Sequence, residues 1–201
     1  MLGWRRYLSI EEDFLRARYY VAFDVEYAHS DFLSKSVILL GAEIEASFKN
    51  LCSLIDNKAP RGNICQYKGI LLKALPNLGN FKSILREDTE QNYLPFEGWD
   101  KGSLLWWDVY NNIKHSSDDK TATMKVAMTM LSAYQLLIIL IAAYEEGKSD
   151  DRIAYTQLDI PRLLIPDVAM GMCQQDDDEG LIPFGFSASE LKEKLKKAVS
   201  I

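Results

Sequence analysis

The sequence predicts an all-α fold, a four- to five-helix bundle, and three observations support this prediction. Apolar residues recur at helical spacing, most clearly at Val37, Leu40, Ile44, Phe48, Leu51 and Ile55. Capping residues precede several such stretches, and Gly or Pro follows them. The 201 residues, 48% of them hydrophobic and 26% charged, fit one globular domain with an appendage. The net charge of −6 argues against a general nucleic-acid binder, so any such activity must come from a local site.

The first two helices are predicted from caps and from apolar spacing. The first spans 10–29, because Ser9 is a suitable N-cap and Glu12 follows at the spacing of a capping box. The second spans 31–55, with Asp31 as its cap and the long apolar stripe along one side.

Three further helices are predicted after a loop that contains Pro and Gly. A short helix covers 64–74. Ser103 caps the next helix, over 104–116, and a long helix follows over 121–146 with Gly147 as its C-cap.

The segment of about 78–102 is predicted to be irregular. It contains Pro95, three glycines and four aromatic residues, namely Phe81, Tyr93, Phe96 and Trp99. We expect either a long ordered loop or a small hairpin, packed onto the bundle by these aromatic side chains.

The sequence pattern changes after Gly147. We therefore divide the chain into a helical bundle, residues 1–147, and a C-terminal extension, residues 148–201. Prolines punctuate residues 160–166, which predicts an extended crossing segment. Ser187 and Glu190 have capping-box spacing and open a short amphipathic helix to about residue 199. The extension either packs on the bundle or binds a protein partner.

The cysteines and the N-terminus predict a cytoplasmic protein. Cys52, Cys65 and Cys173 include no C-x-x-C pair, so neither a disulfide framework nor a zinc knuckle is indicated. We expect buried thiols in a reducing compartment. Acidic residues follow the N-terminus within a few positions, which excludes a signal peptide.

One apolar stretch, Val126–Tyr144, approaches the length of a membrane span. It contains Thr129, Ser132 and Gln135, and no basic cluster flanks it. These features favour a central bundle helix over a membrane span, so no membrane association is predicted.

The most informative stretch is Trp106–His115. At the angular spacing of a helix, Trp106, Val109, Tyr110 and Ile113 fall on one face, and Asp108, Asn111, Asn112 and His115 fall on the opposite face. Asn111 and His115 are one turn apart, so their side chains can meet. A histidine oriented by Asn is suited to general acid or base work near neutral pH. The alternative is a solvated polar face, or a histidine that caps a helix end.

No metal site or cofactor is predicted. His29 and His115 lie in separate predicted helices, and no cluster of His, Cys and carboxylates has ligand spacing. Glycine-rich phosphate-binding motifs and a nucleophile elbow are absent from the sequence.

The pattern W-x-x-Y-N-x-x-K-H over Trp107–His115 resembles the HEPN superfamily, and more narrowly uncharacterised bacterial HEPN-like proteins with a Y-N-x-x-K-H motif. The runs 40–46 and 94–99 also look like this narrower group, and the resemblance covers about 32–144. HEPN ribonucleases carry a motif such as R-N-x-x-x-H late in a helical bundle. Here Tyr110 stands in the position of the arginine.

The resemblance implies a homodimer in which two motifs meet and cleave RNA without metal through the 2′-hydroxyl. By position, His115 would be the acid or base and Asn111 its orienting or RNA-contacting neighbour. Lys114, Asp108 and Asn112 would contact phosphate or a partner. Tyr110 offers one neutral hydroxyl where the family has a permanently charged planar fork. We therefore expect a catalytically degenerate domain rather than an efficient nuclease.

Three functional hypotheses follow, and they leave open whether the chain is an enzyme. The first is a HEPN-like module in a bacterial stress or defence context that binds RNA, a nucleotide or a protein partner without efficient catalysis. The second is a metal-independent endoribonuclease that uses His115. The third is an all-α dimeric scaffold without a nucleic-acid role, which the acidic balance favours.

Overall fold

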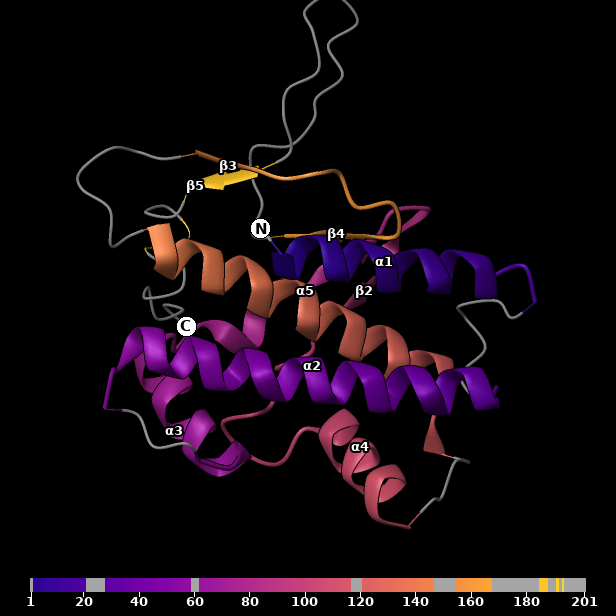
Figure 1. Cartoon of the computed structure of the whole chain (residues 1–201), viewed down its shortest axis with the longest axis horizontal. Helices are drawn as coiled ribbons and strands as arrows, with labels where there is room; N and C mark the ends of the chain where they lie inside the picture. Colours follow the sequence, from indigo (N-terminus) through magenta and orange to yellow (C-terminus); the bar gives the residue numbers. More distant parts are fainter. Residues whose placement is uncertain are drawn as a thin grey trace, which may run out of the picture.

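The computed structural model describes residues 2–20, 28–58, 62–116, 121–146, 155–167, 185–187, 191 and 193 (Figure 1). Its helices are α1 (Leu2–Ala17), α2 (Asp31–Ile55), α3 (Ile64–Ala74), α4 (Leu105–Ser116) and α5 (Met124–Glu146). A 3-10 turn, η1, covers Leu78–Asn80, and the strands are β1 (Ser83–Leu85), β2 (Asp88–Tyr93), β3 (Tyr155–Gln157), β4 (Leu164–Pro166) and β5 (Gly185–Ser187).

The prediction of a purely helical fold is wrong in one respect, because two small sheets accompany the helices. Strands β1, β2 and β4 form an antiparallel sheet in the order β2-β1-β4, and β3 pairs with β5. The β1–β2 hairpin lies within the segment predicted as a loop or hairpin. The pairing of Ser83 with Pro166 joins that hairpin to the extended segment of the tail.

In Figure 1, α5 lies between α1 and α2. Helix α5 packs against α1, α2 and α4, and α3 packs against α2 on the same side as α4. Among the described residues, α5 is the one helix long and apolar enough to span a membrane, over Met124–Glu145, and 83% of its most apolar window is buried inside the protein. This burial agrees with the prediction of a central bundle helix.

Helix α1 begins earlier and ends earlier than the sequence predicted. It starts at Leu2 because Trp4 and Tyr7 extend its buried face by two turns. Ser9 is therefore an exposed residue within the helix and not its cap. His29, predicted at the helix end, lies instead in an isolated bridge with Thr123.

The other helices follow their predicted bounds closely. The N-cap of α2 is Ser30, whose hydroxyl accepts from the Leu33 backbone, so Asp31 is the first helical residue and not the cap. Asn63 and Gln66 form a capping box that begins α3. Gly147 and Glu190 lie outside the described residues. Ser187, predicted as a helix cap, ends β5.

The aromatic residues of the 78–102 segment pack it onto the bundle, as predicted. The side chains of Phe81, Tyr93, Phe96 and Trp99 are all buried. Phe48 of α2 lies at the centre of this cluster, with its ring 5.4 Å from that of Trp99 and 6.2 Å from those of Phe96 and Trp107. Ring separations of this size are favourable and hold α4 against α2.

A buried carboxylate fastens the tail to α1. Glu11 is only 1% exposed, and it accepts the backbone N–H groups of Arg162, Leu163 and Leu164 at 2.8–3.2 Å. The hydroxyl of Tyr7 donates to the same carboxylate at 3.0 Å. Because a buried charge is costly unless hydrogen-bonded, these four donors explain how it can remain inside the protein.

The network continues from Tyr7 into α5. The Gln135 amide donates to the Tyr7 hydroxyl at 2.8 Å and to the Leu164 carbonyl at 2.7 Å. Its oxygen accepts from Ser83 at 2.8 Å, and Ser83 accepts in turn from Ser132. We call Tyr7, Glu11, Ser83, Ser132 and Gln135 the buried network. It joins α1, α5, β1 and β4, so the sheet is fixed to the helices.

Candidate functional site

Helix α4 divides into the two faces that its sequence predicted. The side chains of Trp106, Val109, Tyr110 and Ile113 are buried, whereas Asp108, Asn112 and His115 are exposed. Asn111 is half-buried between the two faces, one turn before His115. The apolar face holds α4 on the bundle, and the polar side is left open to solvent at the end of the helix that carries Lys114 and His115.

The polar residues of this face differ in how they are engaged. The Asp108 carboxylate accepts from the Ser103 hydroxyl at 2.6 Å. It therefore stabilises the first turn of α4, at the opposite end of the helix from Lys114 and His115. Lys114 and His115 occupy the last turn, where positive charge is favoured by the helix dipole. The side chains of Lys114 and His115 are both exposed there.

Tyr110 is fixed by close packing on α2. It is 3% exposed, and its ring lies against Gly41, where a Cβ atom would be only 2.2 Å from a ring carbon. The Trp107 ring also packs against it, with the ring centres 5.4 Å apart. Tyr110 is therefore a packed aromatic ring whose orientation is set by α2 and by Trp107.

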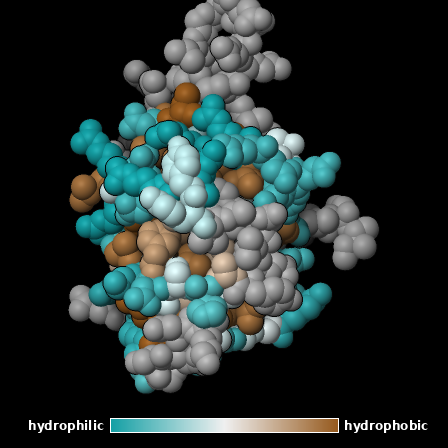
Figure 2. All heavy atoms as spheres, turned by 90° about the vertical axis from the view of Figure 1, so that its right-hand side faces the viewer, coloured by the Kyte–Doolittle hydropathy of each residue, from teal (hydrophilic) through white to brown (hydrophobic). Residues whose placement is uncertain are grey.

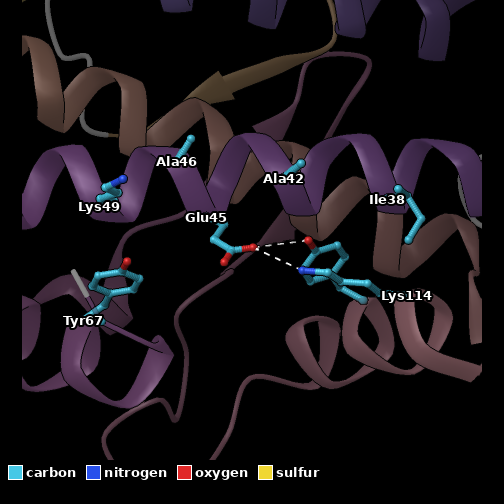
Figure 3. A pocket seen from close by; sticks show the side chains of 9 residues that line it. Ile38, Ala42, Glu45, Ala46, Lys49, Tyr67 and Lys114 are labelled. Carbon is cyan, nitrogen blue, oxygen red and sulfur yellow. Dashed lines mark hydrogen bonds and ion pairs between the residues drawn. The ribbon is translucent and has the colours of Figure 1, made fainter.

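The hydroxyl of Tyr110 reaches the surface beside Glu45 and Lys114. It donates to the Glu45 carboxylate at 3.4 Å, and the Lys114 ammonium lies 3.6 Å from the same carboxylate (Figure 3). The ammonium is also 5.2 Å from the centre of the Tyr110 ring. The hydrogen bond to Tyr110, followed by the negative charge of Glu45, raises the pKa of Lys114. Lys114 therefore keeps its charge throughout the physiological range.

These three residues lie in a groove between α2, α4 and the start of α3 (Figure 3). Its volume is about 660 Å³, and it is also lined by Ile38, Ala42, Ala46, Lys49, Gly62 and Tyr67. Figure 3 shows Tyr67 projecting from α3 towards the side of α2 that carries Lys49. We call this feature the α2–α4 groove. It combines small apolar residues, two tyrosines, two lysines and one carboxylate.

The residues with metal-binding side chains are dispersed. In the part of the chain that the structure describes, no group of three or more His, Cys, Asp or Glu residues is close enough to hold a metal ion. The two described cysteines differ from each other, since Cys52 is buried and Cys65 is exposed. The prediction of buried thiols is therefore wrong for Cys65, and Cys173 lies outside the described residues.

Sequence reasoning missed Glu45 as a member of the site, because it lies on α2, some 65 positions from Tyr110 along the chain. Periodicity places Glu45 on a solvated face but cannot identify which other helix approaches that face. Gly41 carried the available signal, since a glycine inside a long helix often marks the close approach of another group.

The surface on the side where α2 begins and α4 ends is mixed in character. Figure 2 shows hydrophilic residues over most of its described part, with hydrophobic residues between them.

Comparison of the chain with protein-family models finds no match, and the same is true of comparison with curated proteins and with solved structures. The function of the site is therefore inferred from its residues and their geometry.

Proposed function

We propose that the protein is a HEPN-like helical module that binds RNA or a nucleotide at the α2–α4 groove without efficient cleavage, in the cytoplasm of a bacterium under stress or attack. The observation that supports this proposal best is the charged Lys114 at the edge of the groove, one residue before the exposed His115. A lysine at this position can bind phosphate as a point charge.

The groove offers suitable contacts to the rest of a nucleotide. The apolar side chains of Ala42 and Ala46 can pack on a base, and the Glu45 carboxylate can accept from an amino group or a ribose hydroxyl. The net charge of −6 opposes long-range attraction of RNA, so binding depends on this local site.

The same geometry disfavours efficient cleavage. Tyr110 is neutral and packed, and the nearest cation, Lys114, is paired with Glu45. Loss of a preorganised donor aimed at developing charge costs about 10²–10³ in rate. A phosphate bound here would therefore lack the bidentate charged partner that the family motif supplies.

Binding is tested with a fluorescein-labelled single-stranded oligoribonucleotide and fluorescence anisotropy. Lys114→Ala should weaken binding by about threefold to tenfold. It should also reduce the slope of log affinity against log salt concentration by the amount expected for about one phosphate contact. Lys73→Ala is the matched control, because Lys73 is an exposed lysine on α3 that does not line the groove. Competition with a mononucleotide distinguishes a nucleotide site from an RNA site. Equal affinity of the two variants, or no binding by the wild type, would reject the proposal.

A second candidate function is a metal-independent endoribonuclease. The observation in its favour is that His115 is exposed one turn after Asn111, as a proton-transfer group and its neighbour require. Incubation of RNA with the wild type and with His115→Ala in EDTA tests it. Our proposal expects no cleavage that depends on His115, and fast cleavage lost in the variant would establish the nuclease instead.

A further inference from the structure

Glu45 presents a carboxylate to the α2–α4 groove. Its side chain is 48% exposed, and Figure 3 shows it projecting from α2 towards α4. One carboxylate oxygen, Oε2, accepts from the Tyr110 hydroxyl at 3.4 Å and lies 3.6 Å from the Lys114 ammonium. A carboxylate has about four lone-pair positions on its two oxygens. Glu45 can therefore accept two further hydrogen bonds from a ligand in the groove.

Two neighbours restrict the orientation of this carboxylate. The Tyr110 ring is packed against Gly41 and Trp107, so its hydroxyl is a donor in a fixed place. The Lys114 ammonium attracts the same oxygen from α4. A side chain that is already oriented loses less conformational freedom when a ligand binds. Glu45 is therefore better prepared to recognise a ligand than an isolated surface glutamate.

Three charged groups follow one another along the groove. Lys49 is one turn after Glu45 on the same side of α2, and Lys114 approaches Glu45 from α4, on the other side (Figure 3). A flat ligand whose edge faces α2 therefore meets a donor at Lys49 and two acceptor oxygens at Glu45. The small side chains of Ala42 and Ala46 leave room for such a ligand. The groove volume of about 660 Å³ is within the usual range of small-molecule sites, about 300–1,000 Å³.

Guanine is the base whose hydrogen-bonding edge matches this order. Its Watson–Crick edge carries the O6 carbonyl, the N1–H group and the N2 amino group side by side, which is one acceptor followed by two donors. Adenine and cytosine each carry one amino group beside a ring nitrogen that accepts, and uracil carries one N–H group between two carbonyls. Each of these three bases would turn an acceptor towards the carboxylate. A carboxylate therefore favours guanine by attraction and disfavours the other bases by repulsion.

We propose that the α2–α4 groove is selective for guanine and that Glu45 is the residue that specifies this base. The inference rests on the proposed function and names its substrate class, a guanine nucleotide, free or within single-stranded RNA. In the complex, Glu45 accepts from N1–H and from the N2 amino group, and Lys49 donates to O6. Ala42 and Ala46 contact the base. Lys114, at the edge of the groove, is left for the phosphate.

Oligoribonucleotides that differ in one base test the selectivity. Fluorescein-labelled octamers of uridine carry guanosine, inosine or adenosine at one central position, and fluorescence anisotropy measures each dissociation constant. The wild type should bind the guanosine octamer about fivefold to tenfold more tightly than the adenosine octamer. Inosine keeps N1–H and lacks the N2 amino group, so the affinity of its octamer should fall between the other two. Displacement by unlabelled GMP shows whether the free nucleotide suffices or the RNA chain is required.

Glu45→Gln tests the assignment of the residue. An amide has both an acceptor and donors, which suits adenine as well as guanine, so the variant should bind the guanosine and adenosine octamers within about twofold of each other. The ratio of two affinities measured on one protein does not depend on the folded fraction. Glu97→Gln is the matched control, because Glu97 is an exposed glutamate that does not line the groove. This control should keep the wild-type ratio.

Equal affinity of the wild type for the guanosine and adenosine octamers would overturn the inference, and so would a wild-type ratio in Glu45→Gln. If binding in either case still depends on Lys114, the proposed function stands and only the guanine selectivity fails. A wild type that binds none of the octamers would reject both.

Discussion

The buried network and the α2–α4 groove use the same chemical groups in opposite settings. Each pairs a glutamate with a tyrosine hydroxyl, Glu11 with Tyr7 and Glu45 with Tyr110. Glu11 is 1% exposed and accepts four hydrogen bonds of 2.8–3.2 Å. Glu45 is exposed, and its contacts with Tyr110 and Lys114 are 3.4 and 3.6 Å.

This difference separates a structural site from a site that can bind a ligand. In the buried network each donor has a short, fixed acceptor, and loss of one partner leaves another group unsatisfied away from water. In the groove, water or a ligand can replace the long contacts at little cost. Stability should therefore depend on the first region and binding on the second.

Removal of the Glu11 carboxylate gives the largest expected effect. Glu11→Ala leaves three backbone N–H groups and the Tyr7 hydroxyl without their acceptor, so the free energy of unfolding should fall by about 3–5 kcal/mol. Urea unfolding measures it. Glu12→Ala is the matched control, because Glu12 forms partly exposed ion pairs with Arg16 and Arg162 and should cost below about 1 kcal/mol. Equal losses in the two variants would contradict the structural role of the buried network.

A methyl group at Gly41 tests the packing of Tyr110 beside the groove. Gly41→Ala places a Cβ 2.2 Å from the Tyr110 ring and should lower the free energy of unfolding by about 1–3 kcal/mol. Gly69→Ala in α3 meets nothing within 4 Å and should raise it by about 0.5–1 kcal/mol. The two variants should change the free energy of unfolding in opposite directions, although both replace a helical glycine with alanine. A neutral Gly41→Ala would show that Tyr110 is free to move.

Removing one tyrosine hydroxyl from each region compares the energetic contributions of the two regions most directly. Tyr7→Phe takes away a donor to Glu11 and an acceptor for Gln135, so it should cost about 1–3 kcal/mol of unfolding free energy. Tyr110→Phe loses the contact of 3.4 Å with Glu45 and the hydrogen bond with Lys114, both with exposed partners, and should cost below about 0.5 kcal/mol. Similar costs would mean that the groove contact is as structural as the buried one.

Alkaline pH should weaken the core through two buried groups that hold their protons tightly. Burial raises the pKa of Cys52 from about 9 to about 12 and the pKa of Tyr93 from about 10 to about 12. The folded state therefore holds these protons more tightly than the unfolded state, and stability is lost as pH rises through this window. In urea unfolding experiments, the contribution of these groups to the free energy of unfolding should be constant near neutral pH. It should decline above about pH 9. Stability that rises from pH 9 to 11 would contradict the assignment.

Most of the helical framework could be predicted from the sequence because it is encoded locally. The bounds of α2, α3 and α4 follow from apolar spacing and from the residues that separate the helices, although the cap of α2 is Ser30 and not Asp31, and the capping box of α3 was not predicted. The start of α1 was missed because Ser9 and Glu12 imitate a capping box in the middle of the helix. The sheet was missed because β4 pairs with β1 about eighty positions away, and three-residue strands carry almost no periodic signal.

Only the part of the candidate site that lies on α4 could be predicted from the sequence, because that part is also encoded locally. The two faces of α4 follow from its own periodicity, which correctly placed Tyr110 on the buried side and His115 on the open side. The partners Gly41, Glu45 and Tyr67 come from other helices, and their approach is set by tertiary packing. The buried position of Glu11 could not be read from its neighbours, since its acceptor role depends on the tail.

The division between a structural and a binding region is tested most directly by measuring RNA affinity and unfolding free energy for Lys114→Ala and Tyr7→Phe side by side. The structure predicts that Lys114→Ala weakens RNA binding at unchanged stability and that Tyr7→Phe lowers stability at unchanged affinity. Wild-type affinity in Lys114→Ala, or weakened RNA binding by folded Tyr7→Phe, would contradict it.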